Sequence, residues 1–206
     1  MQRKSQDNAM TELEYEKKML LTKAEYAALA ERYRGMPTES QTNRYFDTED
    51  FDMNRRGITC RIRAKNGAYR TTVKNHGLCT PDCSAEAHLY EGTGFHSGVF
   101  EALGLSLQGE LTTERLLLYQ TDFCKTVLDR NTYLGYTDYE IEAEYTAGHE
   151  KQALHCLRRA ASELAAEGLI DSAKHFMLRI GVGKSKSERF FERKNTKRRV
   201  ISCNPF

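Results

Sequence analysis

The chain has 206 residues, of which 39% are hydrophobic and 29% are charged, and its 31 Lys and Arg residues nearly balance its 29 Asp and Glu residues. This composition is typical of a globular domain with a buried core and excludes a disordered chain. No apolar run approaches the roughly 18 residues of a membrane-spanning helix, and residues 1–10 lack an apolar signal core, so we expect a cytoplasmic protein without a membrane partner.

The first half of the chain is predicted to contain mainly strands. Residues 11–21 alternate charged and apolar side chains, as a half-buried strand does. Thr22, with Glu25 three residues later, is a capping-box pattern that predicts the start of a helix over 22–34. A loop is expected over 75–84. Further strands are expected at 41–48, 57–65, 68–74 and 85–91.

The second half adds strands and the clearest helix. Residues 93–103 predict a short helix that ends at Gly104. Residues 148–169 predict a longer helix, because apolar side chains recur there on one stripe. Strands are expected at 112–121, 123–131 and 136–145. Since no repeat or long linker interrupts this pattern, it indicates a single α+β domain with about eight mostly antiparallel strands.

Two predicted strands carry a row of carboxylates on one face. The side chains that share these faces are Glu12, Glu14, Glu16 and Lys18 in the first strand, and Asp138, Glu140, Glu142 and Glu144 in the last. Carboxylates on one face lie about 7 Å apart and repel one another by roughly 2 kcal/mol at an effective dielectric constant near 20. A solvated outer face is the ordinary interpretation of one such row. Two rows favour a cation between them, and Mg²⁺ or Mn²⁺ suits oxygen ligands.

Two other strands carry basic rows. Arg61, Arg63 and Lys65 share one face, and Arg70, Thr72 and Lys74 alternate in the same way on the next strand. A surface patch that attracts nucleic acid is one interpretation. Nucleic-acid surfaces place aromatic residues among the basic ones, whereas small aliphatic residues intervene here, so we expect no nucleic-acid partner. Repeated Arg suits a polyanion with many oxygens, because its fork of donors fits phosphate.

The acidic and basic rows together predict a sheet with one apolar face and one face of mixed charge. Such a face is costly to bury unless its charges pair and a ligand completes the set. If the sheet closed on itself, the charged face would line a tunnel and helices would pack against the outside. Basic groups would hold a phosphate chain and carboxylates would hold metal against it.

With these residues in place, the sequence resembles the CYTH superfamily, the triphosphate tunnel metalloenzymes, and the bacterial single-domain branch in particular. The match runs over about residues 10–191, and one position departs from it, since Thr113 stands where the family often has a basic residue. The matching elements are Glu14-x-Glu16-x-Lys18, the pair Arg61 and Arg63, Thr72-x-Lys74, Arg115, Asp129, Glu142-x-Glu144, and Ser185-Lys186 followed by Arg189.

The resemblance implies an eight-stranded antiparallel closed β-barrel, the tunnel, with helices outside. It also implies one domain over 1–206, with a core at about 10–191 and a basic extension at 192–206 that we expect to be solvated or disordered. Mg²⁺ or Mn²⁺ is the implied cofactor. The implied triphosphate ligands are Lys18, Arg61, Arg63, Lys74, Arg115, Lys186 and Arg189. The implied metal ligands are Glu14, Glu16, Asp129, Glu142 and Glu144, with Glu140 as a further candidate.

Three functions remain open from the sequence. The first is metal-dependent hydrolysis of inorganic triphosphate or of a nucleoside or thiamine triphosphate, with Glu142, Glu144 and Lys18 as catalytic residues. One carboxylate, Glu142 or Glu144, would orient the attacking water. The second is an adenylate cyclase that makes cyclic AMP and pyrophosphate from ATP. The third is a polyphosphate or nucleotide sensor without turnover, which the acidic rows disfavour. Both a monomer and a homodimer are compatible with the sequence.

Overall fold

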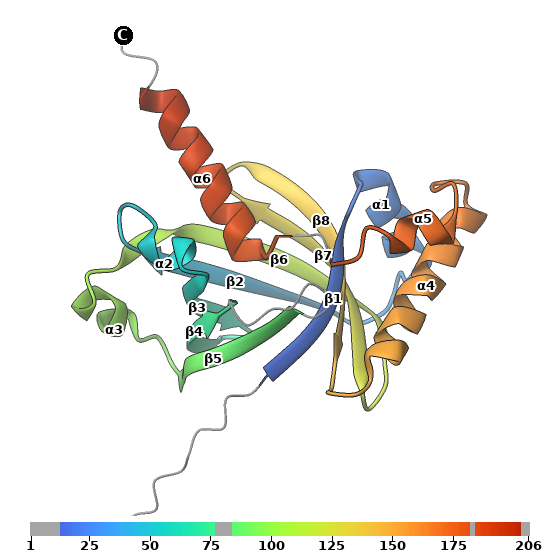
Figure 1. Cartoon of the computed structure of the whole chain (residues 1–206), viewed down its shortest axis with the longest axis horizontal. Coiled ribbons are helices and arrows are strands. Elements are labelled where there is room, and N and C mark those ends of the chain that lie inside the picture. The colour runs from blue at the N-terminus through green and yellow to red at the C-terminus, as the bar shows by residue number, and fades with distance from the viewer. Residues whose placement is uncertain (1–12, 77–83, 182–183, 203–206) are drawn as a thin grey trace, which may run out of the picture.

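The computed structural model describes residues 13–76, 84–181 and 184–202 (Figure 1). Glu12 and most of the loop expected over 75–84 therefore lie outside the described residues. Eight strands form the sheet: β1 (Leu13–Leu21), β2 (Thr38–Asp47), β3 (Ile58–Lys65), β4 (Ala68–Asn75), β5 (Ser84–Thr93), β6 (Ser106–Gln120), β7 (Cys124–Tyr133) and β8 (Tyr136–Tyr145).

All strand pairs are antiparallel, and the order β1-β5-β4-β3-β2-β6-β7-β8 returns to its start because β8 also pairs with β1. The prediction of an α+β fold with eight antiparallel strands is confirmed. Because the side chains of directly paired residues lie on the same face, this order places the acidic and basic rows on one concave surface.

The prediction of a closed barrel is confirmed, because β1 pairs with β8 on one side and with β5 on the other. Among the described residues, β1 and β5 share four pairs, Leu13–Glu16 with Ser84–Ala87, whereas seven pairs join β1 to β8. Beyond Glu16, the second side of β1 meets a non-strand segment, in which the Gly181 amide donates to the Lys18 carbonyl. Tilt and stagger accumulate around a curled sheet, so the strands that meet last overlap only in part. The barrel is therefore closed, and its shortest strand overlap among the described residues lies between β1 and β5.

Three helices cover one outer flank of the sheet (Figure 1): α1 (Lys23–Arg32), α4 (Glu150–Ala166) and α5 (Ala173–Met177). They bury the apolar faces of β1, β6, β7 and β8, and Met19, Leu128, Ile141, Leu157 and Leu164 form the centre of this core. Because apolar side chains face these helices, the alternate side chains of the same strands must face the concave side.

The helices α2 (Asp52–Arg55) and α3 (Ser97–Ala102) lie on the opposite side of the molecule (Figure 1). Phe100 of α3 packs on Phe46 and Ile62 from the outer faces of β2 and β3. No helix in the described ranges is long and apolar enough to cross a membrane.

The last helix, α6 (Lys186–Ser202), was not predicted from the sequence, which indicated a solvated or disordered extension over 192–206; residues 192–198 are helical and mostly exposed. It is helical from Lys186 to Ser202, and its first turns enter one end of the curled sheet, where Phe190 and Phe191 pack with Tyr45, Leu111 and Tyr133. A helix therefore fills that end of the concave face from within, whereas every helix was expected outside.

Gly109 makes room for this packing. It has φ 142°, and a Cβ added there would lie 2.9 Å from Cζ of Phe190. The register between β2 and β6 shifts beside it, between Tyr45 and Phe46. Glycine thus permits both the bulge and the close approach of α6.

Candidate active site

A cavity of about 490 Å³ lies on the concave side of the sheet. Strands supply most of its wall, and the start of α6 with the preceding Ser185, the turn at 121–123, His76 and Thr146 supply the rest. The charged side chains that line it are Glu16, Lys18, Glu39, Arg61, Arg63, Lys65, Lys74, Arg115, Asp122, Lys125, Glu142, Glu144 and Lys186. Most of the residues that the sequence selected therefore converge on one space.

The basic wall comes from β3 and β4. Arg61 faces Thr72 across the two strands, and Thr59 faces Lys74. The Arg61 Nε donates to the Thr72 hydroxyl at 3.1 Å. This hydrogen bond fixes the Arg61 guanidinium at the cavity wall, which is the arrangement that phosphate recognition requires.

Arg63 is held in the same way from the other neighbouring strand. Its Nε donates to Oδ1 of Asn43 in β2 at 2.9 Å. Asn43 is fully buried, and its Nδ2 lacks a hydrogen-bond partner among the residues that the structure describes. Since the side-chain amide gives up a donor to present its oxygen to Arg63, we read Asn43 as a residue that positions this guanidinium.

The opposite wall is organised by Arg115 of β6. Its guanidinium donates through Nε and Nη2 to the two oxygens of Asp129, at 2.8 and 2.7 Å. It also donates to Glu142, and through Nη1 to Glu144 at 2.9 Å. Arg115 and Asp129 face each other across β6 and β7, which explains the bidentate pair. The positive charge between the acidic side chains is therefore supplied in part by the protein.

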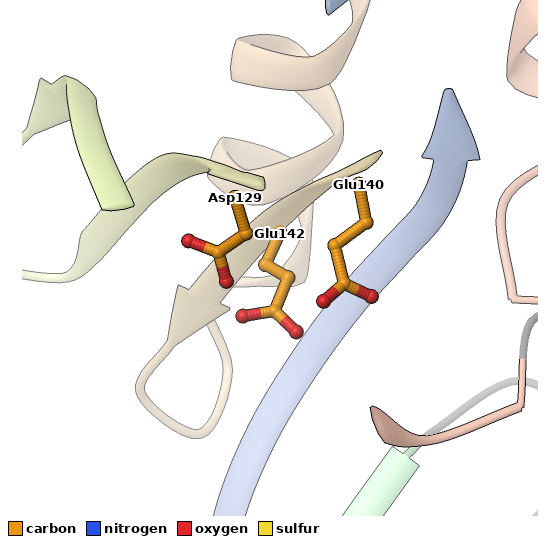
Figure 2. Close-up of side chains that lie close together, drawn as sticks. All are labelled: Asp129, Glu140 and Glu142. Carbon is orange, nitrogen blue, oxygen red and sulfur yellow. The ribbon is translucent and has the colours of Figure 1, made fainter. Parts of the chain in front are cut away.

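Lys186, the first residue of α6, supplies a second cation. Its Nζ lies 2.9 Å from Asp129, 2.7 Å from Glu142, and also contacts Glu140. Figure 2 shows the three carboxylates converging from β7 and β8. Ser185 and Glu188 cap the start of α6, since the Ser185 hydroxyl accepts from the Glu188 amide and the Glu188 carboxylate accepts from the Ser185 amide.

These carboxylates also fit a divalent metal. Asp129, Glu140 and Glu142 offer oxygen atoms that lie within 4.8 Å of one another. Hard oxygen donors of this kind suit Mg²⁺ and Mn²⁺. The same oxygens are ion-paired with Lys186, so a metal bound there would replace the ammonium group in part or move it toward a bound anion.

Two pKa shifts show how strongly the charges of this site depend on one another. Burial alone would raise the pKa of the Glu142 carboxyl, but Lys186, Arg115 and Lys18 hold it well below its usual range. Burial alone would lower the pKa of the Lys18 ammonium, whereas Glu16, Glu142 and Glu140 raise it. Both groups are therefore charged at neutral pH.

Among the predicted side chains that the structure describes, Asp129, Glu140 and Arg189 are not part of the cavity wall. Arg189 points toward the end filled by α6, where it binds Asp138 at 2.9 Å, Glu140 at 2.9 Å and the Lys184 carbonyl at 2.6 Å. Its donors serve an internal ion-pair network in this structure, so phosphate binding by Arg189 stays a prediction. The Glu14 side chain lies outside the described part, although its backbone faces Glu86 across β1 and β5.

Thr113, the departure from the family pattern, is fully buried and donates to Oδ1 of Asn131 at 2.7 Å. It belongs to a neutral layer between the charged cavity and the aromatic end at α6. The sequence analysis also missed Asn43, Glu39, Lys125 and Phe123. Strand alternation could have identified Glu39 as an inward-facing residue, since it lies two positions before Gln41. The sequence does not show which strand lies beside Glu39, so its partners could not be predicted.

Comparison with known proteins agrees with this geometry. The family model described as the CYTH domain matches residues 12–173, which is more than half of the chain. The chain belongs to the CYTH domain family. The putative triphosphatase YjbK of Bacillus subtilis (strain 168) is 32% identical over 154 residues, and the match covers 68% of this chain and 80% of that protein.

Solved structures of similar fold were also found, and they cover most of this chain. A crystal structure of a putative adenylate cyclase from Bacillus halodurans has a TM-score of 0.61 and 24% identity, and the match covers 88% of this chain and 98% of that one. The putative adenylyl cyclase HpAC1 from Hippeastrum, described as having a dominant triphosphatase activity, has a TM-score of 0.61 and 17% identity over 87% and 95% of the two chains. At these identities the likeness establishes the CYTH fold alone.

Proposed function

We propose that this CYTH domain is a divalent-metal-dependent triphosphatase that hydrolyses the terminal phosphoanhydride bond of a triphosphate. The observation that carries the proposal is the pairing of two walls in one cavity, a basic wall at β3 and β4 and a wall of buried carboxylates with Arg115 and Lys186 opposite. A triphosphate brings several negative charges into a small volume, and such a ligand matches this arrangement better than a monoanion would.

The basic wall would bind and orient the phosphate chain. Arg61 and Arg63 are fixed through their Nε atoms, and Lys74 is buried beside them. Phosphoryl transfer needs little covalent chemistry from the protein, because positioning and charge stabilisation supply most of the acceleration. Lys18 and Lys186 would complete the grip from the acidic side of the cavity.

Glu144 is the better candidate to orient the attacking water. The Glu142 carboxylate already accepts from Lys186 and Arg115, which lowers its pKa and its basicity. The Glu144 side chain is 42% exposed and contacts one nitrogen of Arg115. In the reaction, the water oxygen would form a bond to the terminal phosphorus while the bond to the bridging oxygen breaks. The remaining diphosphate would leave, and the proton of the water would pass through Glu144 to solvent.

The carboxylates Asp129, Glu140 and Glu142 would hold the divalent cation, together with Glu16 at the edge of the cavity, which leaves Glu144 to the attacking water. A cation bound there would neutralise charge on the phosphate oxygens. Lys186 would then be available to the anion, because its ammonium group shares the same three carboxylates.

A substrate panel tests the proposal. The purified protein is incubated with Mg²⁺ or Mn²⁺ and with inorganic triphosphate, ATP or thiamine triphosphate, and the products are separated. We expect free phosphate from at least one substrate and none in the presence of EDTA. Cyclic AMP with pyrophosphate as products would instead indicate a cyclase, and binding without turnover would indicate a sensor. Either result would overturn the triphosphatase assignment.

A further inference from the structure

Two stacked rings lie at the open end of the cavity, opposite the end that α6 fills. Phe123, in the turn between β6 and β7, lines the cavity together with its neighbours Asp122 and Lys125. Its ring stacks on the His149 imidazole with a centroid separation of 4.1 Å and an interplanar angle of 2°. His149 immediately precedes α4, so the pair joins two connections at the same edge of the sheet.

Hydrogen bonds hold the two rings in place. The Thr146 amide donates to the Phe123 carbonyl at 3.0 Å, and the Thr146 hydroxyl lies 2.9 Å from Nδ1 of His149. Thr146 thus links the backbone beneath one ring to the edge of the other. Phe123 still remains 47% exposed, although His149 covers one face of its ring. The surface that Phe123 offers to the cavity is therefore flat, apolar and held before any ligand binds.

The pair lies far from Asp129, whereas Glu144, which faces Lys125, is nearer to it. Asp129 is six residues beyond Phe123 in the chain, most of them in β7, which corresponds to about 20 Å along an extended strand. A chain of three phosphates held by Arg115 and Lys186 is much shorter than this distance. Lys65 and Lys125 also line the cavity, and Lys65 pairs with Glu39 at 2.7 Å.

We propose that Phe123, backed by His149, is a stacking surface for the planar ring of an organic triphosphate, so that the substrate class is nucleoside triphosphates. This inference rests on the proposed function, because it takes the phosphates to lie among Arg61, Arg63 and Lys186. The end at α6 is filled by Phe190 and Phe191, so an organic group attached to the phosphates extends toward Phe123. Stacking on a phenyl ring does not distinguish purines by their edges, and ATP and GTP are expected to behave alike.

The test compares ATP, GTP and inorganic triphosphate, by steady-state kinetics and by calorimetric binding, in wild type and Phe123→Ala. Base stacking on an aromatic residue corresponds to about a 5- to 150-fold change in affinity. We expect Phe123→Ala to lose that factor in kcat/KM and in affinity for ATP and GTP, and to keep the wild-type values for inorganic triphosphate. Phe123→Tyr should retain nucleotide binding because it keeps the ring.

Phe95→Ala is the matched control. Phe95 is 48% exposed, packs edge-on against Tyr69, and is not among the residues that line the cavity. Its loss should therefore leave kcat/KM and affinity unchanged for all three ligands. Equal effects of Phe123→Ala on all three ligands, or no effect on the nucleotides, would overturn the stacking proposal. Failure of the wild type to release phosphate from any of them would overturn the triphosphatase proposal, while calorimetry would still decide whether Phe123 contacts the base.

Discussion

Arg61 and Arg63 show how neighbouring strands fix the orientation of a cationic side chain. Each guanidinium uses Nε to bond a side chain from the strand beside it, Thr72 on one side and Asn43 on the other. Free arginine side chains lose considerable rotamer entropy when they bind a ligand, and these bonds remove part of that loss in advance. The two acceptors thereby contribute to phosphate binding without touching the phosphate.

Replacing Thr72 with Val tests this role. The change is nearly isosteric and leaves Arg61 Nε without its acceptor. A hydrogen bond to a charged group contributes about 1.5–3 kcal/mol, so we expect kcat/KM for a triphosphate substrate to fall at least about tenfold, mainly through KM. Thr72→Ser keeps the hydroxyl and should restore the value. A Val variant with wild-type KM, or a Ser variant as impaired as Val, would show that Thr72 does not position Arg61.

Lys186 is the other residue whose position has a measurable consequence. The Lys186 side chain is 13% exposed, and its ammonium group contacts three carboxylates. Lys186→Gln leaves those carboxylates with Arg115 and Arg189 as their cationic partners. Removing one partner of a buried ion pair costs about 3–5 kcal/mol, so the variant should be destabilised by up to that amount. A divalent cation that binds the same carboxylates should restore part of the loss.

The measurement is thermal unfolding of wild type and Lys186→Gln with and without Mn²⁺. We expect Tm of the variant to rise more on addition of Mn²⁺ than Tm of the wild type. Lys184→Gln is the control, since Lys184 lies two residues away and pairs with Glu192 at the surface. Equal responses to Mn²⁺ in all three proteins would place the metal away from this carboxylate cluster.

The capping box of α1 shows what the sequence can predict at the scale of one element. Thr22 and Glu25 predict a helix start, and the structure confirms it: the Thr22 hydroxyl accepts from the Glu25 amide at 3.2 Å, and the Glu25 carboxylate accepts from the Thr22 amide at 2.6 Å. The Glu25 carboxylate also binds Arg179, just after α5, at 2.5 Å. A local pattern was sufficient for the cap, whereas the distant arginine could not be predicted from it.

Thr22→Ala should therefore lower the free energy of unfolding by about 1 kcal/mol, because it removes the acceptor of an otherwise unpaired amide. Denaturant unfolding of wild type, Thr22→Ala and Thr22→Ser measures the effect. The Ser variant retains a hydroxyl and should lie close to wild type. If Ala and Ser are equally stable, the cap does not contribute to folding.

Elements that depend on tertiary contacts were harder to predict. The strand β8 was predicted with its observed bounds, Tyr136–Tyr145, because its alternation is regular. By contrast β6 begins at Ser106, six residues before the predicted strand, and α6 was missed. The charged side chains of α6 gave no apolar stripe, and the burial of Phe190 becomes visible only when the aromatic end of the sheet is known.

At the scale of the whole molecule, the sequence predicted which side chains share a face and could not predict how the sheet closes. Alternation depends only on the period of a strand, so it placed Arg61, Glu142 and Lys18 on the inner side. Closure depends on the stagger summed over eight strands, and the short overlap of β1 with β5 follows from that sum. For the same reason the sequence could not place Arg189 in its ion-pair network or identify Phe123 as a residue that lines the cavity.

The central claim is that the inward-facing charges form one triphosphate site. A crystal structure of the protein with a non-hydrolysable triphosphate analogue and Mn²⁺ tests it most directly. We predict that the phosphates lie between Arg61 and Arg63 on one wall and Lys186 on the other, with Lys186 displaced from Asp129 and Glu142. Phosphates bound on the outer surface, or bound in the cavity with the contacts of Lys186 unchanged, would contradict the account.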